Sequence, residues 1–277
     1  MSRLRRALAL SAVLSLAAVG TAAATNGGYQ DRAPSRMFWA TTDQNQLIRF
    51  NARNPQRLRD VRAITGLPAG VTLNGIDFRP ATGDLYGVGS DSVVYRLNPH
   101  TGIAVAEGPA FTPGLRGQWF GVDFNPVPDK IRVVSDARQN LRLNVDEGTV
   151  LSADKDINPG MPRIVGAAYL NSSFSATRPT ATTLYVIDSA SDMVLKQDPP
   201  NDGTLKDGRP LRIDVQDQAG FDIAGRENTG YLATRTRAAR GAGLYAVNPD
   251  TGATRLLGRI GGGRSLVVTG LAAWQDA

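Results

Sequence analysis

Cysteine is absent from the 277 residues, and histidine occurs once, at His100. Without cysteine the fold has no disulfides, so its stability must come from a buried core. A single imidazole argues against a multi-histidine metal site within one chain, and it excludes a Ser-His-Asp triad unless His100 itself serves. Nucleophile-elbow and phosphate-loop motifs are also missing. The sequence therefore carries few of the usual signs of an enzyme.

Long apolar runs are missing except near the N-terminus. There, arginines precede an apolar run over residues 7–19, and small alanines follow it. We expect residues 1–24 to be an export signal, which is too short to be a transmembrane segment. Residues 25–36 are polar and are expected to form a flexible lead-in. Export predicts a protein of the periplasm or cell envelope, or one released from the cell.

The positive charge of the chain is smaller than it first looks. The formal net charge is +6, but Arg3, Arg5 and Arg6 lie in the expected export signal. No basic module interleaved with aromatic residues follows, so we expect no nucleic-acid partner.

One stretch, residues 75–102, returns in altered form along the chain. Its opening, Gly-Ile-Asp-Phe, has counterparts at 121–124, 166–169, 220–223 and 270–274, with spacings of 46, 45, 54 and 50. Its closing turn, Asn-Pro-His-Thr-Gly, has counterparts at 51–55, 144–148, 198–203 and 248–252, with matching spacings. Two markers that share one period indicate a structural repeat of about 46 residues.

The residues between the two markers are typical of strands. Short apolar runs at 85–88 and 93–97 are separated by Gly-Ser-Asp-Ser, a hairpin-turn sequence. Four short strands per repeat predict an all-β fold, a five-bladed β-propeller of four-stranded blades. The first copy begins in mid-repeat at Met37, and the last supplies a lone opening strand at 269–274. Pairing of these two ends would close the ring, so we expect a single domain over 37–277.

Three repeats carry aspartate at one equivalent position: Asp77, Asp123 and Asp222. The other two copies have Ala168 and Ala272. Because opening strands usually line the channel of a propeller, the three carboxylates could converge, and they would then repel unless protonated, solvated or bound to a cation. Alternatively, each aspartate caps a turn or bonds neighbouring strands within its blade. The sequence leaves both interpretations open.

Two insertions lengthen the repeat, at 171–183 and 235–243. Insertions in repeat folds map to loops, where function often resides, but a solvated and merely tolerated loop is the alternative. Trp39, Trp119 and Trp274 lie beside strand starts, and we expect them to pack rather than to bind ligand. The recurring arginines either form a solvated face or attract a small anion by long-range steering.

The Gly-x-Asp-Phe opening, the Leu-Tyr second strand, the Leu-x-x-Asn-Pro-x-Thr-Gly turn and the phrase TTDQNQLIRFN resemble a secreted bacterial propeller family. That family is catalogued as a domain of unknown function, number four-three-nine-four. The resemblance covers residues 37–274 and implies a secreted or cell-envelope propeller. Some envelope members carry the label of copper-dependent superoxide dismutase.

We therefore hypothesise an exported antioxidant that disproportionates superoxide at a bound copper ion. Candidate ligands are Asp77, Asp123, Asp222 and His100. Superoxide is a small anion, for which a positive chain is favourable. Redox copper, however, generally prefers several imidazole or sulfur ligands, and this chain has few.

Two other functions stay open. The propeller could be non-catalytic and bind an envelope protein, a glycan or a small ligand through its loops, helping to organise the envelope. It could also be a hydrolase or lyase that acts on sugars in the channel, with the three aspartates as acid and base groups.

Overall fold

The computed structural model describes residues 35–175, 177–225, 227–236 and 239–275, which all belong to one compact unit. The expected export signal at 1–24 lies outside them, as does most of the lead-in. Arg36 is buried, and its guanidinium donates to the carbonyl of Trp274 (2.6 Å) and to Glu227 Oε2 (2.7 Å). Within the described residues, no helix is long and apolar enough to cross a membrane.

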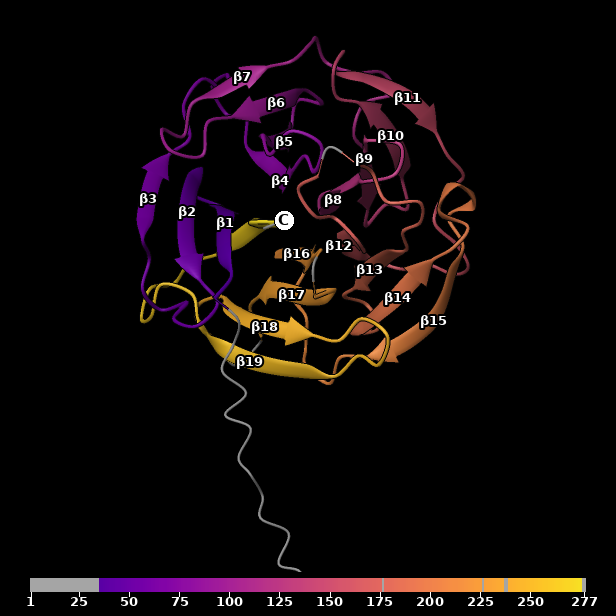
Figure 1. Ribbon diagram of the computed structural model, residues 1–277. Coiled ribbons are helices and arrows are strands. Elements are labelled where there is room, and N and C mark those ends of the chain that lie inside the picture. The colour runs from indigo at the N-terminus through magenta and orange to yellow at the C-terminus, as the bar shows by residue number, and fades with distance from the viewer. Residues whose placement is uncertain (1–34, 176, 226, 237–238, 276–277) are drawn as a thin grey trace, which may run out of the picture. The chain divides into compact units, whose positions relative to one another are not determined.

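The described residues form five four-stranded antiparallel sheets arranged around an axis (Figure 1). From the axis outwards, blade 1 is β20 (Val268–Ala273), β1 (Met37–Thr42), β2 (Gln46–Asn51) and β3 (Asp60–Ala63); blade 2 is β4 (Leu73–Phe78), β5 (Leu85–Gly89), β6 (Val94–Leu97) and β7 (Ala104–Ala106); blade 3 is β8 (Phe120–Asn125), β9 (Lys130–Ser135), β10 (Asn140–Asn144) and β11 (Thr149–Ala153); blade 4 is β12 (Ile164–Tyr169), β13 (Leu184–Asp188), β14 (Met193–Gln197) and β15 (Leu205–Pro210); blade 5 is β16 (Ala219–Ala224), β17 (Thr229–Thr234), β18 (Gly243–Val247) and β19 (Thr254–Arg259). One 3-10 helix, Pro200–Asp202, precedes β15. The predicted fold class and blade number are confirmed.

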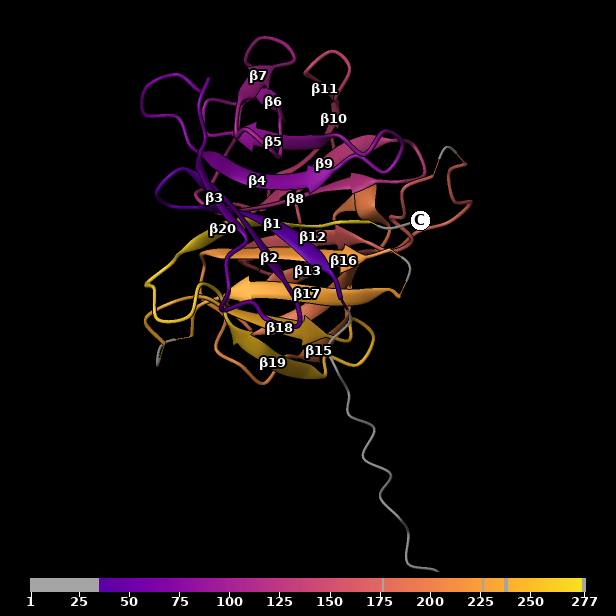
Figure 2. The same cartoon turned by 60° about the vertical axis from the view of Figure 1, so that its left-hand side comes forward.

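The ring closes through blade 1, which is made from both ends of the domain. Strand β1 pairs with β20 in antiparallel register, Phe38 opposite Ala273 and Ala40 opposite Leu271, and the two lie side by side in Figure 2. The innermost strands contact one another in the order β4, β8, β12, β16, β20 and back to β4. The expected closure by the terminal strands is therefore what the structure has.

The hydrophobic core lies between the blades. Between blades 2 and 3, for example, Val88 and Val94 pack against Phe124 and Val133. Each blade has a neighbour on both faces, so strands such as β5 are buried at every position. This explains why the sequence shows short continuous apolar runs, not the alternation of a half-exposed sheet.

The closing turn of each repeat joins the two outer strands of a blade. In blade 2, Asn98 Oδ1 accepts the backbone N–H groups of His100 (2.9 Å) and Thr101 (3.0 Å). Gly102 has a φ of 79°, the left-handed region that favours glycine. His100 is exposed in this turn, between β6 and β7 and away from the innermost strands.

Candidate functional site

A cavity of about 230 Å³ lies at the end of the ring where the innermost strands begin. All five blades line this cavity, which we call the axial pocket. Its polar lining includes the hydroxyls of Thr72 and Thr269 and the carboxamides of Asn74, Gln118 and Gln218. One half-buried indole, that of Trp119, completes it. A concave site with an aromatic side chain and several convergent hydrogen-bonding groups is typical of small-ligand binding.

The charged side chains that line the axial pocket are acidic. Asp217 forms an ion pair with Arg163 (3.2 Å) and accepts a hydrogen bond from Ser189 Oγ (2.7 Å). Asp43 is exposed, and its side chain has no hydrogen bond or ion pair within the described part of the chain. No lysine or arginine is among the described lining residues. The pocket therefore suits a neutral or cationic ligand better than an anion.

Below the axial pocket the channel narrows at the opening glycines. The space there is about 10 Å³, at the limit for one water molecule. A Cβ on Gly121 would lie 2.5 Å from the backbone N of Ala167, and one on Gly220 would lie 2.6 Å from the backbone N of Leu271. Glycine recurs at this position because neighbouring innermost strands approach too closely for any side chain.

Gly121→Ala is expected to lower the free energy of unfolding by about 1–3 kcal/mol, because the added methyl must displace a neighbouring backbone. Urea unfolding at fixed pH would measure it. Gly263→Ala is the matched control, since a Cβ there meets nothing within 4 Å. Equal effects of the two substitutions would contradict this explanation of the repeat.

Beyond the constriction, the structure brings Asp77, Asp123 and Asp222 together. Their carboxylate oxygens can lie within 4.8 Å of one another, and the residues are 3%, 1% and 1% exposed. Asp77, Asp123 and Asp222 are the described His, Cys, Asp or Glu side chains close enough to share an ion. His100 is not among them, so only three of the four predicted ligands meet.

The three carboxyls accept hydrogen bonds from one backbone N–H of every blade. Each innermost strand pairs on one side only, which leaves its axial edge without a strand partner. Asp77 accepts from Phe78 (2.7 Å) and Phe124 (2.8 Å), Asp123 from Tyr169 (2.9 Å), and Asp222 from Ile223 (2.6 Å) and Ala273 (2.6 Å). These five N–H groups occupy one equivalent position of the repeat. Three aspartates thus satisfy five blades, and Ala168 and Ala272 need no carboxyl.

These bonds refine the second sequence-based interpretation of the aspartates. The expected strand bonding occurs, but in each case one bond crosses to the next blade, as from Phe124 to Asp77. Convergence on the axis also occurs. The two interpretations are therefore compatible, because the same carboxyls that converge also join the blades.

The environment keeps the three carboxyls partly protonated. Burial raises the pKa of Asp222 to about 7. Burial, followed by the charge of Asp222, raises the pKa of Asp77, and burial with the charges of Asp77 and Asp222 raises that of Asp123. A hydrogen bond between the two carboxyls lowers the pKa of Asp77 and raises that of Asp123, which makes Asp123 the proton donor.

The insertion at 171–183 packs over the aspartate end of the channel. The Phe174 ring lies 4.7 Å from that of Trp274 and 5.9 Å from that of Phe78. Its backbone N–H donates to the carbonyl of Gln275 (3.1 Å), whose side chain in turn accepts from the N–H of Gly225 (2.7 Å). This insertion therefore has a structural role, since it helps to bury the three carboxyls.

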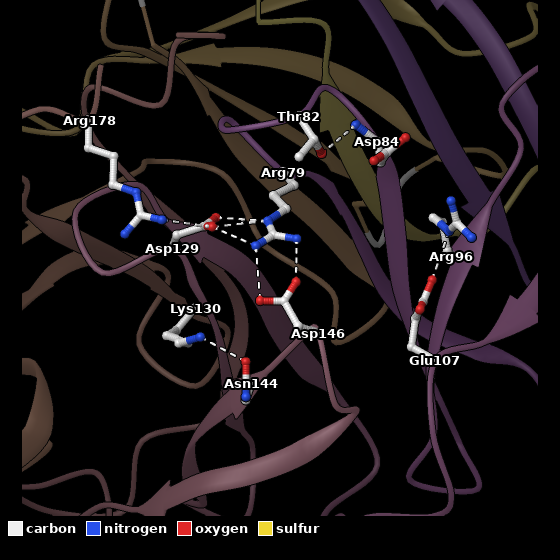
Figure 3. A network of polar contacts seen from close by, with 10 residues as sticks. All are labelled: Arg79, Thr82, Asp84, Arg96, Glu107, Asp129, Lys130, Asn144, Asp146 and Arg178. Carbon is white, nitrogen blue, oxygen red and sulfur yellow. Dashed lines mark hydrogen bonds and ion pairs between the residues drawn. The ribbon is translucent and has the colours of Figure 1, made fainter. Parts of the chain in front are cut away.

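An ion-pair network holds the insertion to blades 2 and 3 (Figure 3). Arg79, in the turn after β4, contacts Asp129 (2.6 Å) and Asp146 (2.7 Å) of blade 3. Arg178 of the insertion reaches the same Asp129 (3.2 Å). Arg79 and Asp129 are largely buried, so the network ties three blades together at this end.

The arginines noted in the sequence are mostly paired with acidic or polar groups. Arg96 contacts Glu107 at 2.7 Å (Figure 3). Buried Arg132 contacts Asp154 (2.7 Å), and so does Arg142 (2.8 Å). In the second insertion, Arg235 donates to Gln218 (2.7 Å), whereas Arg237 lies outside the described residues. These contacts leave little free positive charge to attract an anion.

The tryptophans differ in their roles. Trp39 and Trp274 pack against each other, with ring centroids 5.7 Å apart, as expected. Trp119 packs partly against the core between blades 4 and 5 but also lines the axial pocket. Sequence reasoning missed the pocket, although a signal exists: its lining lies one to three residues before each opening glycine, as Asn74 and Trp119 do.

Comparisons with known proteins bear on the fold. The model of the family described as Domain of unknown function (DUF4394) matches residues 46–272, whereas no curated protein matches. Among solved structures, a protein of unknown function from Bacteroides thetaiotaomicron VPI-5482 is 16% identical, with a TM-score of 0.48. Dihydro-heme d1 dehydrogenase NirN in complex with DHE and YCF48 bound to D1 peptide are each 12% identical, with TM-scores of 0.39 and 0.40.

All three alignments cover 80% of this chain. The chain spans 57% of the Bacteroides protein, 43% of NirN and 77% of YCF48. At these identities and TM-scores, the likeness assigns no ligand and no activity to this chain.

Proposed function

The chain belongs to the family described as Domain of unknown function (DUF4394), and we propose that it is an exported propeller that binds a small ligand in its axial pocket without chemical turnover. The observation that carries the proposal is the convergence of Asn74, Gln118, Gln218 and Trp119 in one cavity formed by five blades. Export rests on the signal expected at residues 1–24. Binding an envelope glycan in this pocket would give the protein a role in organising the envelope.

Copper-dependent superoxide dismutase, the function implied by the resemblance, finds a poor donor set here. Oxygen ligands suit magnesium, calcium or manganese, whereas redox copper prefers imidazole or sulfur. The clustered Asp77, Asp123 and Asp222 supply carboxyl oxygens alone, and the hydrogen bonds already engage five of the six. His100 lies in an outer turn. The residues present therefore do not fit copper.

A hydrolase or lyase that uses the three aspartates is also disfavoured. A sugar in the axial pocket would be separated from them by the glycine constriction of about 10 Å³. Two carboxyls at the scissile bond are the usual requirement for glycoside hydrolysis. Of the acids that line the pocket, Asp217 is already held by Arg163 and Ser189, which leaves Asp43 without a partner acid.

The proposal predicts saturable binding of a monosaccharide that depends on the pocket lining. Gln118→Ala and Asn74→Ala should each weaken binding by roughly fivefold to tenfold, the equivalent of one hydrogen bond of about 1 kcal/mol. Isothermal titration with a panel of neutral and amino monosaccharides would measure the affinities. Because Trp119 lines the pocket, the same titration should change tryptophan fluorescence in the wild type and not in Trp119→Phe.

Gln44→Ala provides the matched control, since Gln44 is an exposed neighbour of Asp43 that does not line the pocket. Its affinity should equal that of the wild type. Absence of binding by every sugar of the panel, or equal losses in Gln44→Ala and Gln118→Ala, would overturn the proposal.

A further inference from the structure

The axial pocket holds one carboxylate that no protein group neutralises. The side chain of Asp43 has no hydrogen bond or ion pair in the described ranges, whereas Asp217 is paired with Arg163. We propose that Asp43 receives a protonated amine, and that the ligand of the pocket is an amino sugar of one ring. This inference rests on the proposed function and names its ligand class.

The size of the pocket favours a single ring. Pockets for drug-sized ligands measure about 300–1,000 Å³, and the axial pocket measures about 230 Å³. The constriction beneath it closes the channel to anything larger than water. The ligand therefore enters from the open mouth and stops at the level of the opening glycines.

The polar groups of the lining match a polyol. The carboxamides of Asn74 and Gln118 offer both donors and acceptors, and their side chains have no hydrogen bond within the described residues. The hydroxyl of Thr72 is placed in the same way. Several free, uncharged hydrogen-bonding groups around one aromatic ring suit a molecule with many hydroxyls and an apolar face.

The placement of Asp43 suits a charged substituent at the edge of that molecule. Asp43 lies in the turn between β1 and β2, and its backbone N–H is held by the carbonyl of Val267 (3.1 Å). Trp119, from blade 3, lies two blades away around the same pocket. A ring that contacts the indole can therefore direct a substituent towards Asp43, where a carboxylate binds an ammonium through a charge-assisted hydrogen bond.

The test compares glucose, glucosamine and N-acetylglucosamine by isothermal titration at pH 6 and low salt. Glucosamine should bind about fivefold to tenfold more tightly than glucose, as expected for one charge-assisted contact. N-acetylglucosamine, which has no charge, should behave like glucose. In Asp43→Asn the preference should vanish, while glucose binds as in the wild type, and added salt should reduce the preference only where Asp43 is present.

Asp84→Asn is the matched control, because Asp84 is an exposed turn aspartate in the turn after β4, where the innermost strand ends. It should keep the full preference for glucosamine. Equal affinities of glucose and glucosamine, both weakened by Gln118→Ala, would overturn the amine contact and keep the binding function. Failure of all three sugars to bind would overturn both.

Discussion

Asp222→Asn is expected to lower the free energy of unfolding by about 2–3 kcal/mol, whereas Asp123→Asn stays within about 1 kcal/mol of the wild type. Each oxygen of Asp222 accepts a different N–H group, from Ile223 and Ala273. An asparagine there would turn its NH₂ group towards one of these donors and leave it buried and unpaired. Asp77→Asn should act like Asp222→Asn, because Asp77 also accepts two N–H groups.

Asp123 differs because only one of its oxygens accepts a backbone N–H, from Tyr169. Its other oxygen faces Asp77 as the proton donor, and an asparagine NH₂ can donate in its place. Urea unfolding of the three variants would measure the contrast. Comparable losses in all three would contradict the hydrogen-bonding role, since a shared metal ion would depend on each carboxyl alike.

The free energy of unfolding is expected to fall as the pH rises from about 4 to 7. An unfolded aspartate has a pKa of about 3.9, whereas burial raises that of folded Asp222 to about 7. Between these values the folded state binds more protons than the unfolded chain, so raising the pH favours unfolding. The stabilisation is fully present below the unfolded pKa and is lost through the folded one.

The groups that face Asp222 set the size of this effect. The charge of Arg36 lowers the pKa of Asp222, while Asp77 and Asp123 are acids coupled to it. Asp146 has the opposite sign, because the hydrogen bond from Arg79 lowers its pKa, but its contribution is lost only below about pH 3.9. Urea midpoints at pH 4.5, 6 and 7.5 should therefore decrease in that order.

Asp123→Asn supplies the control for the pH series. It removes one of the coupled carboxyls at little cost in hydrogen bonds, so its midpoints should vary less with pH than those of the wild type. A wild-type midpoint that rises between pH 4.5 and 7.5 would show that these carboxyls are ionised in the folded protein. In that case a bound cation, rather than shared protons, would have to stabilise them.

The two ends of the channel have different roles in this description. At one end, Asp77, Asp123 and Asp222 satisfy backbone groups beneath an insertion that covers them. At the other end, Asn74 and Gln118 have unengaged polar groups in an open cavity. Repeated, conspicuous residues thus hold the ring together, while the proposed ligand site uses residues that differ from blade to blade.

The repeat made the fold predictable. The opening glycine and the Asn-Pro-x-Thr-Gly turn are local features whose spacing does not depend on tertiary contacts, so five blades and their closure followed from the sequence. The reason for the opening glycines did not follow, because the contact between Gly121 and the backbone at Ala167 joins different blades. A single period contains no information on that distance.

The candidate site was less predictable than the fold. The convergence of Asp77, Asp123 and Asp222 was anticipated from their shared repeat position, but the count of five N–H groups needed the coordinates. Trp119 was expected to pack, and it also lines the pocket, because the sequence does not tell at which end of the channel a residue faces solvent. The insertion at 171–183 was ambiguous for the same reason, and Phe174 identifies it as a structural cover.

A crystal structure of the protein grown with both glucosamine and a copper salt, with data collected at the copper absorption edge, would test the central claim most directly. We predict density for the sugar in the axial pocket, within hydrogen-bonding distance of Asn74, Gln118 and Asp43. We also predict no anomalous peak between Asp77, Asp123 and Asp222. A copper peak among those carboxyls together with an empty axial pocket would contradict the binding function and restore the metalloenzyme.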